Sequence, residues 1–189
     1  MMLSENTYEE IIIAGFGGQG IMLAGKLLAQ AAMDCGMEVT YMPSYGAEVR
    51  GGTANCMVVV ADEPIASPVI STPSSLIVMN KASLDKFGQR LKKGGLLVFN
   101  SSLINEKINL KDGRQSLAVP ADKIAVELGS PKSANMVALG AYLEKSGILK
   151  TQAACQGLSK VLAARYHKTL EINCKALLKG AEFARGGTS

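Results

Sequence analysis

The pattern of apolar and polar positions divides the chain into two kinds of segment, short apolar runs typical of strands and longer stretches with the spacing typical of helices. Short runs rich in β-branched residues predict strands at residues 10–14, 38–42, 54–61, 74–80, 96–100 and 114–120. Longer stretches with helical spacing predict helices at residues 19–35, 81–94, 121–128, 133–146, 152–167 and 170–185. This alternation predicts an α/β fold, Rossmann-like, with a mostly parallel sheet flanked by helices and three helices toward the C-terminal end.

The composition fits one domain that spans residues 1–189. Apolar residues fill 48% of the 189 positions, enough to bury a core without metal or disulfide support. The chain starts with an acidic segment where a secretory signal would be basic, and the apolar stretch at 11–33 is interrupted by five glycines, Gln19 and Lys26. We therefore expect a cytoplasmic protein without a membrane span.

The formal net charge of +4 conceals an asymmetry. Residues 1–80 hold two basic and eight acidic residues, whereas residues 81–189 hold eighteen basic and eight acidic ones. The basic residues are spread over several segments with few aromatic neighbours, so we expect no nucleic-acid partner. The first part is poor in charge and holds eight of the nine methionines, which is typical of a surface covered by a partner. In isolation, such a chain is expected to form a homodimer.

The cysteines give no sign of a metal site. Cys35, Cys56, Cys155 and Cys174 contain no CxxC pair, and the single histidine, His167, has no cysteine or histidine beside it. The spacing therefore predicts neither a zinc site nor an iron–sulfur cluster held by this chain. We expect four free, buried thiols in a reducing compartment, and no catalytic residue.

The segment GFGGQG, residues 15–20, follows a predicted strand and opens a predicted helix. In this context Gly15 permits a tight turn, Gly17 lets an anion approach the backbone, and Gly20 lets the helix pack against the sheet. Unpaired amides at the helix start favour a phosphate group. The residues predicted to hold such a ligand are Gly15, Gly17, Gly18, Gln19 and Gly20.

Two features argue against a dinucleotide site. The second strand ends in Tyr41-Met42-Pro43-Ser44 instead of an acid that would hold a ribose, and Glu38 lies at the wrong end of that strand. No lysine followed by Ser or Thr comes after the glycines, so the segment is no P-loop. Two interpretations stay open: an anion site of a different kind, or glycines that only permit close packing.

The helix after the glycines is apolar on all sides. Between residues 21 and 33 only Lys26 and Gln30 are strongly polar. A helix of this kind must be covered all round, either by the core of its own domain or by another subunit.

The segment PSYGAEVRGG, residues 43–52, combines turn formers with a charge pair and a double glycine. A solvent-exposed connection can collect such residues. The functional interpretation is a loop at the carboxyl edge of the sheet, where the Arg50 guanidinium holds a carboxylate, a phosphate or an acidic partner residue. We assign ligand binding to Ser44, Arg50, Gly51 and Gly52, and a subunit interface to Tyr45, Gly46 and Glu48.

Four segments resemble the gamma subunit, or gamma domain, of the 2-oxoacid:ferredoxin oxidoreductases. They are GFGGQG (15–20), SYGAEVRGGTANC (44–56), DEPIASP (62–68) and ANMVALGAY (134–142), in the family's order and over almost the whole chain. The second segment is most similar to the 2-oxoglutarate branch. The fourth contains Asn135, either a further ligand residue or a buried amide that satisfies backbone groups.

The resemblance implies a complex that oxidatively decarboxylates a 2-oxoacid to its acyl-coenzyme A and passes two electrons to ferredoxin. It implies partner alpha and beta subunits, and a ferredoxin-like delta subunit in some complexes, which carry thiamine diphosphate, magnesium and iron–sulfur clusters. For this chain it implies a role in assembly and in binding coenzyme A. Two alternatives are a free-standing NAD(P)-dependent oxidoreductase and a module for assembly alone.

Overall fold

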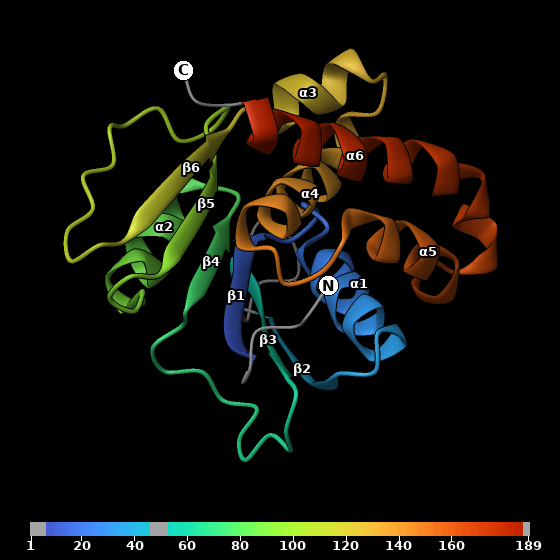
Figure 1. Cartoon of the computed structure of the whole chain (residues 1–189). Coiled ribbons are helices and arrows are strands. Elements are labelled where there is room, and N and C mark those ends of the chain that lie inside the picture. Colours follow the sequence, from blue (N-terminus) through green and yellow to red (C-terminus); the bar gives the residue numbers. More distant parts are fainter. Residues whose placement is uncertain (1–6, 46–52, 187–189) are drawn as a thin grey trace.

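The computed structural model describes residues 7–45 and 53–186, which form a sheet between two layers of helices and loops (Figure 1). Six strands lie in the order β2-β3-β1-β4-β5-β6. The strands are β1 (Tyr8–Phe16), β2 (Glu38–Tyr45), β3 (Thr53–Ala61), β4 (Ser75–Val78), β5 (Leu96–Asn100) and β6 (Gln115–Val119). The helices are α1 (Ile21–Asp34), α2 (Lys81–Phe87), α3 (Ala121–Glu127), α4 (Ala134–Ser146), α5 (Thr151–Val161) and α6 (Leu170–Gly186), with short 3-10 helices η1 (Gly88–Arg90), η2 (Pro131–Ser133) and η3 (Ala164–Thr169).

Five of the six strands run in the same direction, and β3 is antiparallel to its neighbours β1 and β2. Seven residues, 46–52, separate β2 from β3. A parallel neighbour needs a crossover of about a dozen residues or more, so a connection of this length produces an antiparallel pair. The prediction of an α/β fold with a mostly parallel sheet is confirmed, with β3 as the exception.

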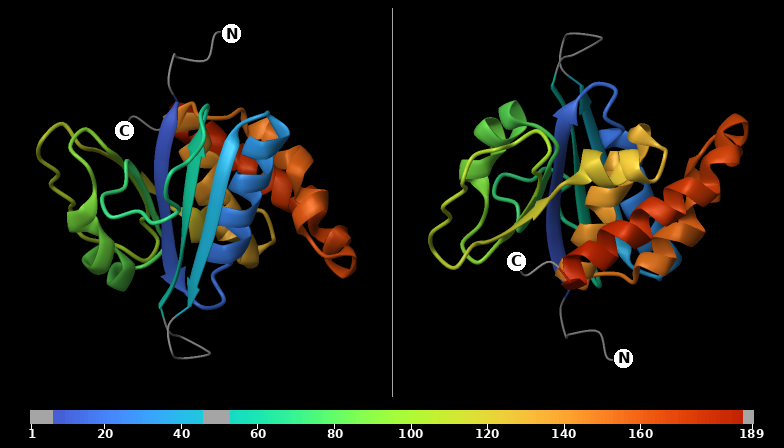
Figure 2. Two further views of the ribbon diagram at one scale, coloured as in Figure 1. Left: turned by 90° about the horizontal axis from the view of Figure 1, so that it is seen from below. Right: turned by 90° about the horizontal axis from the view of Figure 1, so that it is seen from above.

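The two faces of the sheet bury different side chains of the same strands. Ile11 and Ile13 of β1 pack in the core beneath α1, α4, α5 and α6, whereas Ile12 and Ala14 pack in the core beneath α2. Both views of Figure 2 show the sheet between these layers. Since β1 is covered on both faces, it has a continuous apolar run instead of an alternating one.

Helix α1 belongs to the core. It contacts β3 on one side and α5 on another, and its apolar side chains are mostly buried. Exposure is confined to a few positions, among them Lys26 and the side chain of Met33, which is 51% exposed. Of the two interpretations of this helix, cover by its own domain is therefore confirmed.

Helices α4 and α6 pack closely through two glycines. A Cβ atom added at Gly140 would collide with the backbone carbonyl of Leu177, and one added at Gly180 would collide with that of Val137. In α4, every residue from 134 to 143 is buried. Glycine is therefore required here by the close approach of two backbones.

The expectation of four free, buried thiols is wrong for three of the cysteines. Cys155 of α5 and Cys174 of α6 form a disulfide, with their Cα atoms 5.0 Å apart, and Cys35 is free but exposed. Only Cys56 is both free and buried, as expected. Cys155 and Cys174 are 19 residues apart in sequence, and the packing of α5 against α6 brings them together, so no local spacing revealed the pair.

Two helices end earlier than predicted. Helix α2 stops at Phe87 and continues as η1, since Gly88 weakens the helical run. Helix α5 stops at Val161, where Leu162 takes an extended ψ of 128°. In the part of the chain that the structure describes, no helix has both the length and the apolar character needed to cross a bilayer.

Candidate functional site at the carboxyl edge of the sheet

The glycine loop joins the carboxyl end of β1 to the start of α1. Strand β4 is parallel to β1 and ends at Val78, two residues before Asn80, which is the N-cap of α2. Ligands of open α/β sheets bind at this edge, beyond the carboxyl ends of the parallel strands. The loop therefore occupies the position that its sequence predicted.

The glycines of the loop have two roles. An added Cβ would lie 2.7 Å from Gln19 Oε1 at Gly15, and at Gly20 it would collide with the side-chain amide of Asn135. Gly17 and Gly18 are exposed, and at Gly18 an added Cβ would meet no atom of the described residues within 4 Å, although its φ of +100° favours glycine. Gly15 and Gly20 thus serve packing, whereas Gly17 and Gly18 offer bare backbone to a ligand.

The side chain of Gln19 ties the loop to the neighbouring strand. Its Oε1 accepts hydrogen bonds from the Phe16 amide at 2.7 Å and from Asn80 Nδ2 at 3.0 Å. Its Nε2 donates to the carbonyl of Met79 at 3.4 Å. The Gln19 amide thus holds the loop in place, and its predicted contact with a ligand stays a prediction.

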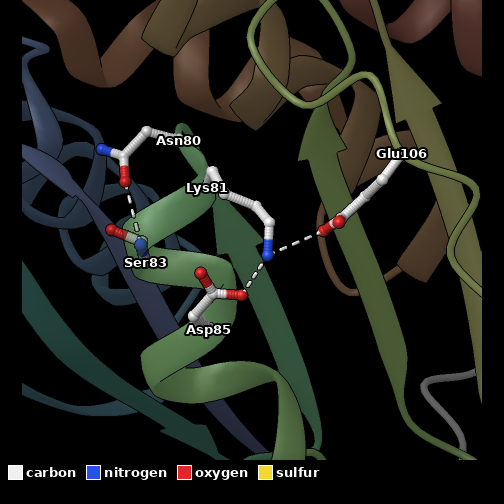
Figure 3. Close-up of polar contacts among 5 residues, drawn as sticks. All are labelled: Asn80, Lys81, Ser83, Asp85 and Glu106. Carbon is white, nitrogen blue, oxygen red and sulfur yellow. Dashed lines mark hydrogen bonds and ion pairs between the residues drawn. The ribbon is translucent and has the colours of Figure 1, made fainter.

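Asn80, which was not among the predicted site residues, connects the loop to helix α2. Its Oδ1 accepts a hydrogen bond from the Ser83 amide at 2.9 Å and caps the helix (Figure 3). The next residue, Lys81, is paired with Asp85 and, at 3.1 Å, with Glu106. Both carboxylates raise the pKa of Lys81, which therefore stays positively charged. An asparagine directly before a helical run was the available signal.

Asn135 contacts the loop from the far end of the chain. It is 4% exposed, and its Nδ2 donates to the Gly20 carbonyl at 2.9 Å. The geometry favours the interpretation in which the buried amide satisfies a backbone group.

The start of α1 offers unpaired backbone donors. Gly20 is its N-cap in a left-handed conformation, no side chain caps it, and its first turn holds no acid. The first amides of a helix have no partner within the helix and carry a partial positive charge. Together with exposed Gly17 and Gly18, they form a small surface suited to an anion. Within the described residues, no group of His, Cys, Asp or Glu is arranged to hold a metal ion.

The second predicted loop starts and ends beside the first. Tyr45 of β2 pairs with Ala54 of β3, which in turn pairs with Gly15 of β1. Ser44 is exposed near the end of β2. Five residues assigned to this loop lie outside the described residues: Gly46, Glu48, Arg50, Gly51 and Gly52. The structure thus brings the two ends of the loop, with Ser44 and Tyr45, to the carboxyl edge. The roles assigned to the other five residues stay predictions.

Asn55 is a further polar residue at this edge. It lies on β3 between Ser44 of β2 and Ala14 of β1. Its side chain is 7% exposed and makes no hydrogen bond to another described residue. In the sequence, the signal for this residue is an amide within a largely apolar strand.

Comparison with known proteins gives a consistent picture. Residues 10–183 match the family described as pyruvate ferredoxin/flavodoxin oxidoreductase. The ketoisovalerate oxidoreductase subunit VorA of Methanothermobacter marburgensis is 35% identical over 173 residues, which cover 92% of this chain and 36% of VorA. The 2-oxoglutarate synthase subunit KorC of the same organism is 35% identical over 185 residues, which cover 95% of this chain and 98% of KorC.

Two solved structures share the fold. The gamma subunit of a keto/oxoacid ferredoxin oxidoreductase from Geobacter sulfurreducens PCA has a TM-score of 0.79 and 29% identity, covering 95% of this chain and 99% of that one. A 2-oxoglutarate:ferredoxin oxidoreductase from Magnetococcus marinus, with 2-oxoglutarate, coenzyme A and succinyl-CoA bound, has a TM-score of 0.85 and 27% identity, covering 96% of this chain and 32% of that one.

This chain therefore spans about a third of VorA and nearly all of KorC. The agreement of sequence and fold over almost its full length shows that it belongs to the pyruvate ferredoxin/flavodoxin oxidoreductase family, among the gamma subunits of 2-oxoacid:ferredoxin oxidoreductases.

Proposed function

We propose that this chain is a single gamma-type domain that works only within a multi-subunit 2-oxoacid:ferredoxin oxidoreductase. The observation that carries the proposal is the match over 95% of the chain and 98% of KorC, at 35% identity. The complex would decarboxylate a 2-oxoacid oxidatively, transfer the acyl group to coenzyme A and pass two electrons to ferredoxin. Alpha and beta subunits, with a ferredoxin-like delta subunit in a four-subunit form, would complete it in the cytoplasm.

The proposed substrate is 2-oxoglutarate. The segment SYGAEVRGGTANC and the similarity to KorC support this choice, whereas the similarity to VorA supports a branched 2-oxoacid. A direct test is to purify the complex from its native host through this chain and compare ferredoxin reduction with 2-oxoglutarate, ketoisovalerate and pyruvate. Faster turnover of either of the last two would overturn the substrate assignment without removing the chain from its complex.

The proposed role of this chain is to help bind coenzyme A at the carboxyl edge. The exposed backbone of Gly17 and Gly18, the uncapped start of α1 and the buried amide of Asn55 supply donors for phosphate and amide groups. The Magnetococcus marinus enzyme contains bound coenzyme A, which supports the choice of ligand. Thiamine diphosphate, magnesium and iron–sulfur clusters would lie on the partner subunits.

Arg50 is the residue through which this role is tested. A guanidinium that holds a phosphate contributes about 1.5–3 kcal/mol, so its loss weakens binding about tenfold or more. We therefore expect Arg50→Ala in the assembled complex to raise the dissociation constant of coenzyme A by that factor, while Arg165→Ala, which removes an arginine stacked on Tyr166 in η3, leaves it unchanged. Equal affinities in the Arg50 variant and the wild type would remove Arg50 from the site.

A free-standing NAD(P)-dependent enzyme is the competing proposal. The strand β2 ends in Ser44 and Tyr45, so its carboxyl end offers no acid for a ribose hydroxyl. Binding of NADH by the isolated chain, measured by fluorescence, would favour this alternative over the subunit role.

A further inference from the structure

A cavity of about 1140 Å³ opens at the amino edge of the sheet, the edge opposite the glycine loop. It is lined by the starts of β1, β4 and β5 and by the connection from α4 to α5. Figure 2 shows the start of β1 and this connection at the same end of the sheet. Small-molecule sites typically measure roughly 300–1,000 Å³, so this cavity accommodates a large organic ligand.

The lining of the cavity is cationic. Four lysines contribute to it, two from the turn before β5 and two from the ends of α4 and α5: Lys92, Lys93, Lys145 and Lys150. None of the four forms an ion pair with another described residue. The acid in the lining, Glu9, accepts hydrogen bonds from Ser75 Oγ at 2.5 Å and from the buried Tyr142 hydroxyl at 3.4 Å. The lysines are therefore free to pair with an anionic ligand.

The start of α5 adds to the positive electrostatic potential of the cavity. Lys150, Gln152 and Gln156 all line the cavity, so this helix begins at its wall. No side chain caps α5, and its first turn contains no acid. Thr151, the first residue of α5, is 5% exposed, and its hydroxyl has no hydrogen-bond partner among the described residues.

The rest of the lining is apolar and includes one aromatic ring. Tyr8 lines the cavity and is 50% exposed, although it is a large hydrophobic side chain. Met37, Ile148 and Leu149 also line the cavity. A partly exposed ring beside apolar side chains offers a stacking surface for a planar base.

We propose that this cavity binds the nucleoside diphosphate group of a nucleotide, with its phosphates among the four lysines and its base against Tyr8. A diphosphate matches the cluster of unpaired ammonium groups, and a base matches the apolar wall. The group can come from free ADP or from the adenosine diphosphate portion of coenzyme A. The proposal rests on this cavity and not on the site at the carboxyl edge.

The test is titration calorimetry on the full chain at low salt with ADP, coenzyme A and inorganic pyrophosphate. We expect Lys145→Gln and Lys150→Gln each to weaken nucleotide binding roughly tenfold. Lys123→Gln and Lys132→Gln, which alter exposed lysines of α3 and η2 outside the cavity, are the matched controls and should leave it unchanged. Tyr8→Leu should weaken ADP binding but not pyrophosphate binding.

Tighter binding of ADP would identify a free nucleotide as the source, and tighter binding of coenzyme A would identify the cofactor. The proposal is overturned if no nucleotide binds at millimolar concentration, or if the cavity variants and the controls bind with the same affinity as the wild type. Coenzyme A that binds independently of Lys145 and Lys150 would be assigned to the carboxyl edge instead.

Discussion

At Gly15 and Gly20 an added methyl group would strike Gln19 and Asn135, whereas at Gly18 it would meet no atom of the described residues within 4 Å. The sequence pattern predicted where these glycines lie but could not divide their roles, because the atoms that crowd Gly20 come from Asn135, far along the chain. The same applies to Gln19, which pairs with Asn80. The roles of individual residues at this edge thus depend on partners that are far away in the sequence.

Asn80 stabilises the fold through two hydrogen bonds, one to the Ser83 amide and one to Gln19. Replacing an N-cap asparagine by alanine costs about 0.5–2 kcal/mol. We therefore expect Asn80→Ala to lower the free energy of unfolding, measured with urea, by about 1–2 kcal/mol. Asn105→Ala, a change at an exposed loop position, is the control. Equal stabilities of the two variants would contradict the capping role.

Burial raises the pKa of the Cys56 thiol from 9.0 to about 12. As the pH rises, the thiol of the unfolded chain loses its proton first. The contribution of the protonated thiol to the free energy of unfolding is therefore fully present below about pH 9 and is lost as the pH rises toward 12. Between these two pH values, the free energy of unfolding falls by about 1.4 kcal/mol per pH unit because of this thiol. Burial also raises the pKa of Tyr142, which affects wild type and variant alike.

The measurement is urea unfolding at pH 8.5 and pH 10.5 for the wild type and Cys56→Ala. The variant should lose less stability between the two pH values than the wild type loses. Identical losses would show that the thiol ionises in the folded protein as readily as in the unfolded chain.

At the scale of elements, all six strands and six helices were predicted near their observed positions, because most carry strong apolar periodicity. Strand β5 matches its prediction at both ends, whereas β2 continues to Tyr45 through Pro43. Proline is tolerated there because β2 is an edge strand. The ends of α2 and α5 were less predictable. Apolar residues continue at helical spacing beyond both ends, but tertiary contacts determine the backbone conformation there.

Helix α6 provides a test of the close packing against α4. Gly180→Ala places a methyl group against the Val137 carbonyl and should lower the free energy of unfolding by about 1–3 kcal/mol or more, despite alanine's higher helix propensity. The methyl group of Gly186→Ala, in the same helix, meets no atom of residues 7–45 and 53–186 within 4 Å and should change the free energy of unfolding by less than about 0.5 kcal/mol. Thermal unfolding of both variants tests this prediction. A Gly180→Ala variant as stable as the wild type would show that α4 and α6 can move apart to accommodate the methyl group.

The disulfide between α5 and α6 predicts a specific count of reactive thiols. Alkylation of the denatured chain without reductant should label Cys35 and Cys56 only, and labelling after reduction should include Cys155 and Cys174. Mass spectrometry reads the number of labels directly. Four labels before reduction would show that the purified chain carries both thiols reduced, as the sequence analysis expected.

At the scale of the whole molecule, the fold and the family could be predicted from the sequence, and the site only in part. Its location followed from the order of strand, glycine loop and helix. The remaining residues could not be assigned, because Asn55 on β3 and Asn80 at the start of α2 are brought beside the loop only by the folded sheet. Nor could the lysines of the amino-edge cavity be assigned, since they come from three separate segments: the turn before β5, the last turn of α4 and the residue before α5.

We propose that this chain acts only as one part of a larger oxidoreductase. The most direct measurement is 2-oxoacid-dependent reduction of ferredoxin by the purified partner subunits, with coenzyme A, in the presence and absence of this chain. We predict turnover when the chain is added and none from the chain by itself. Full activity without it, or reduction of a nicotinamide cofactor by the chain alone, would show that the chain is not a dependent subunit of such a complex.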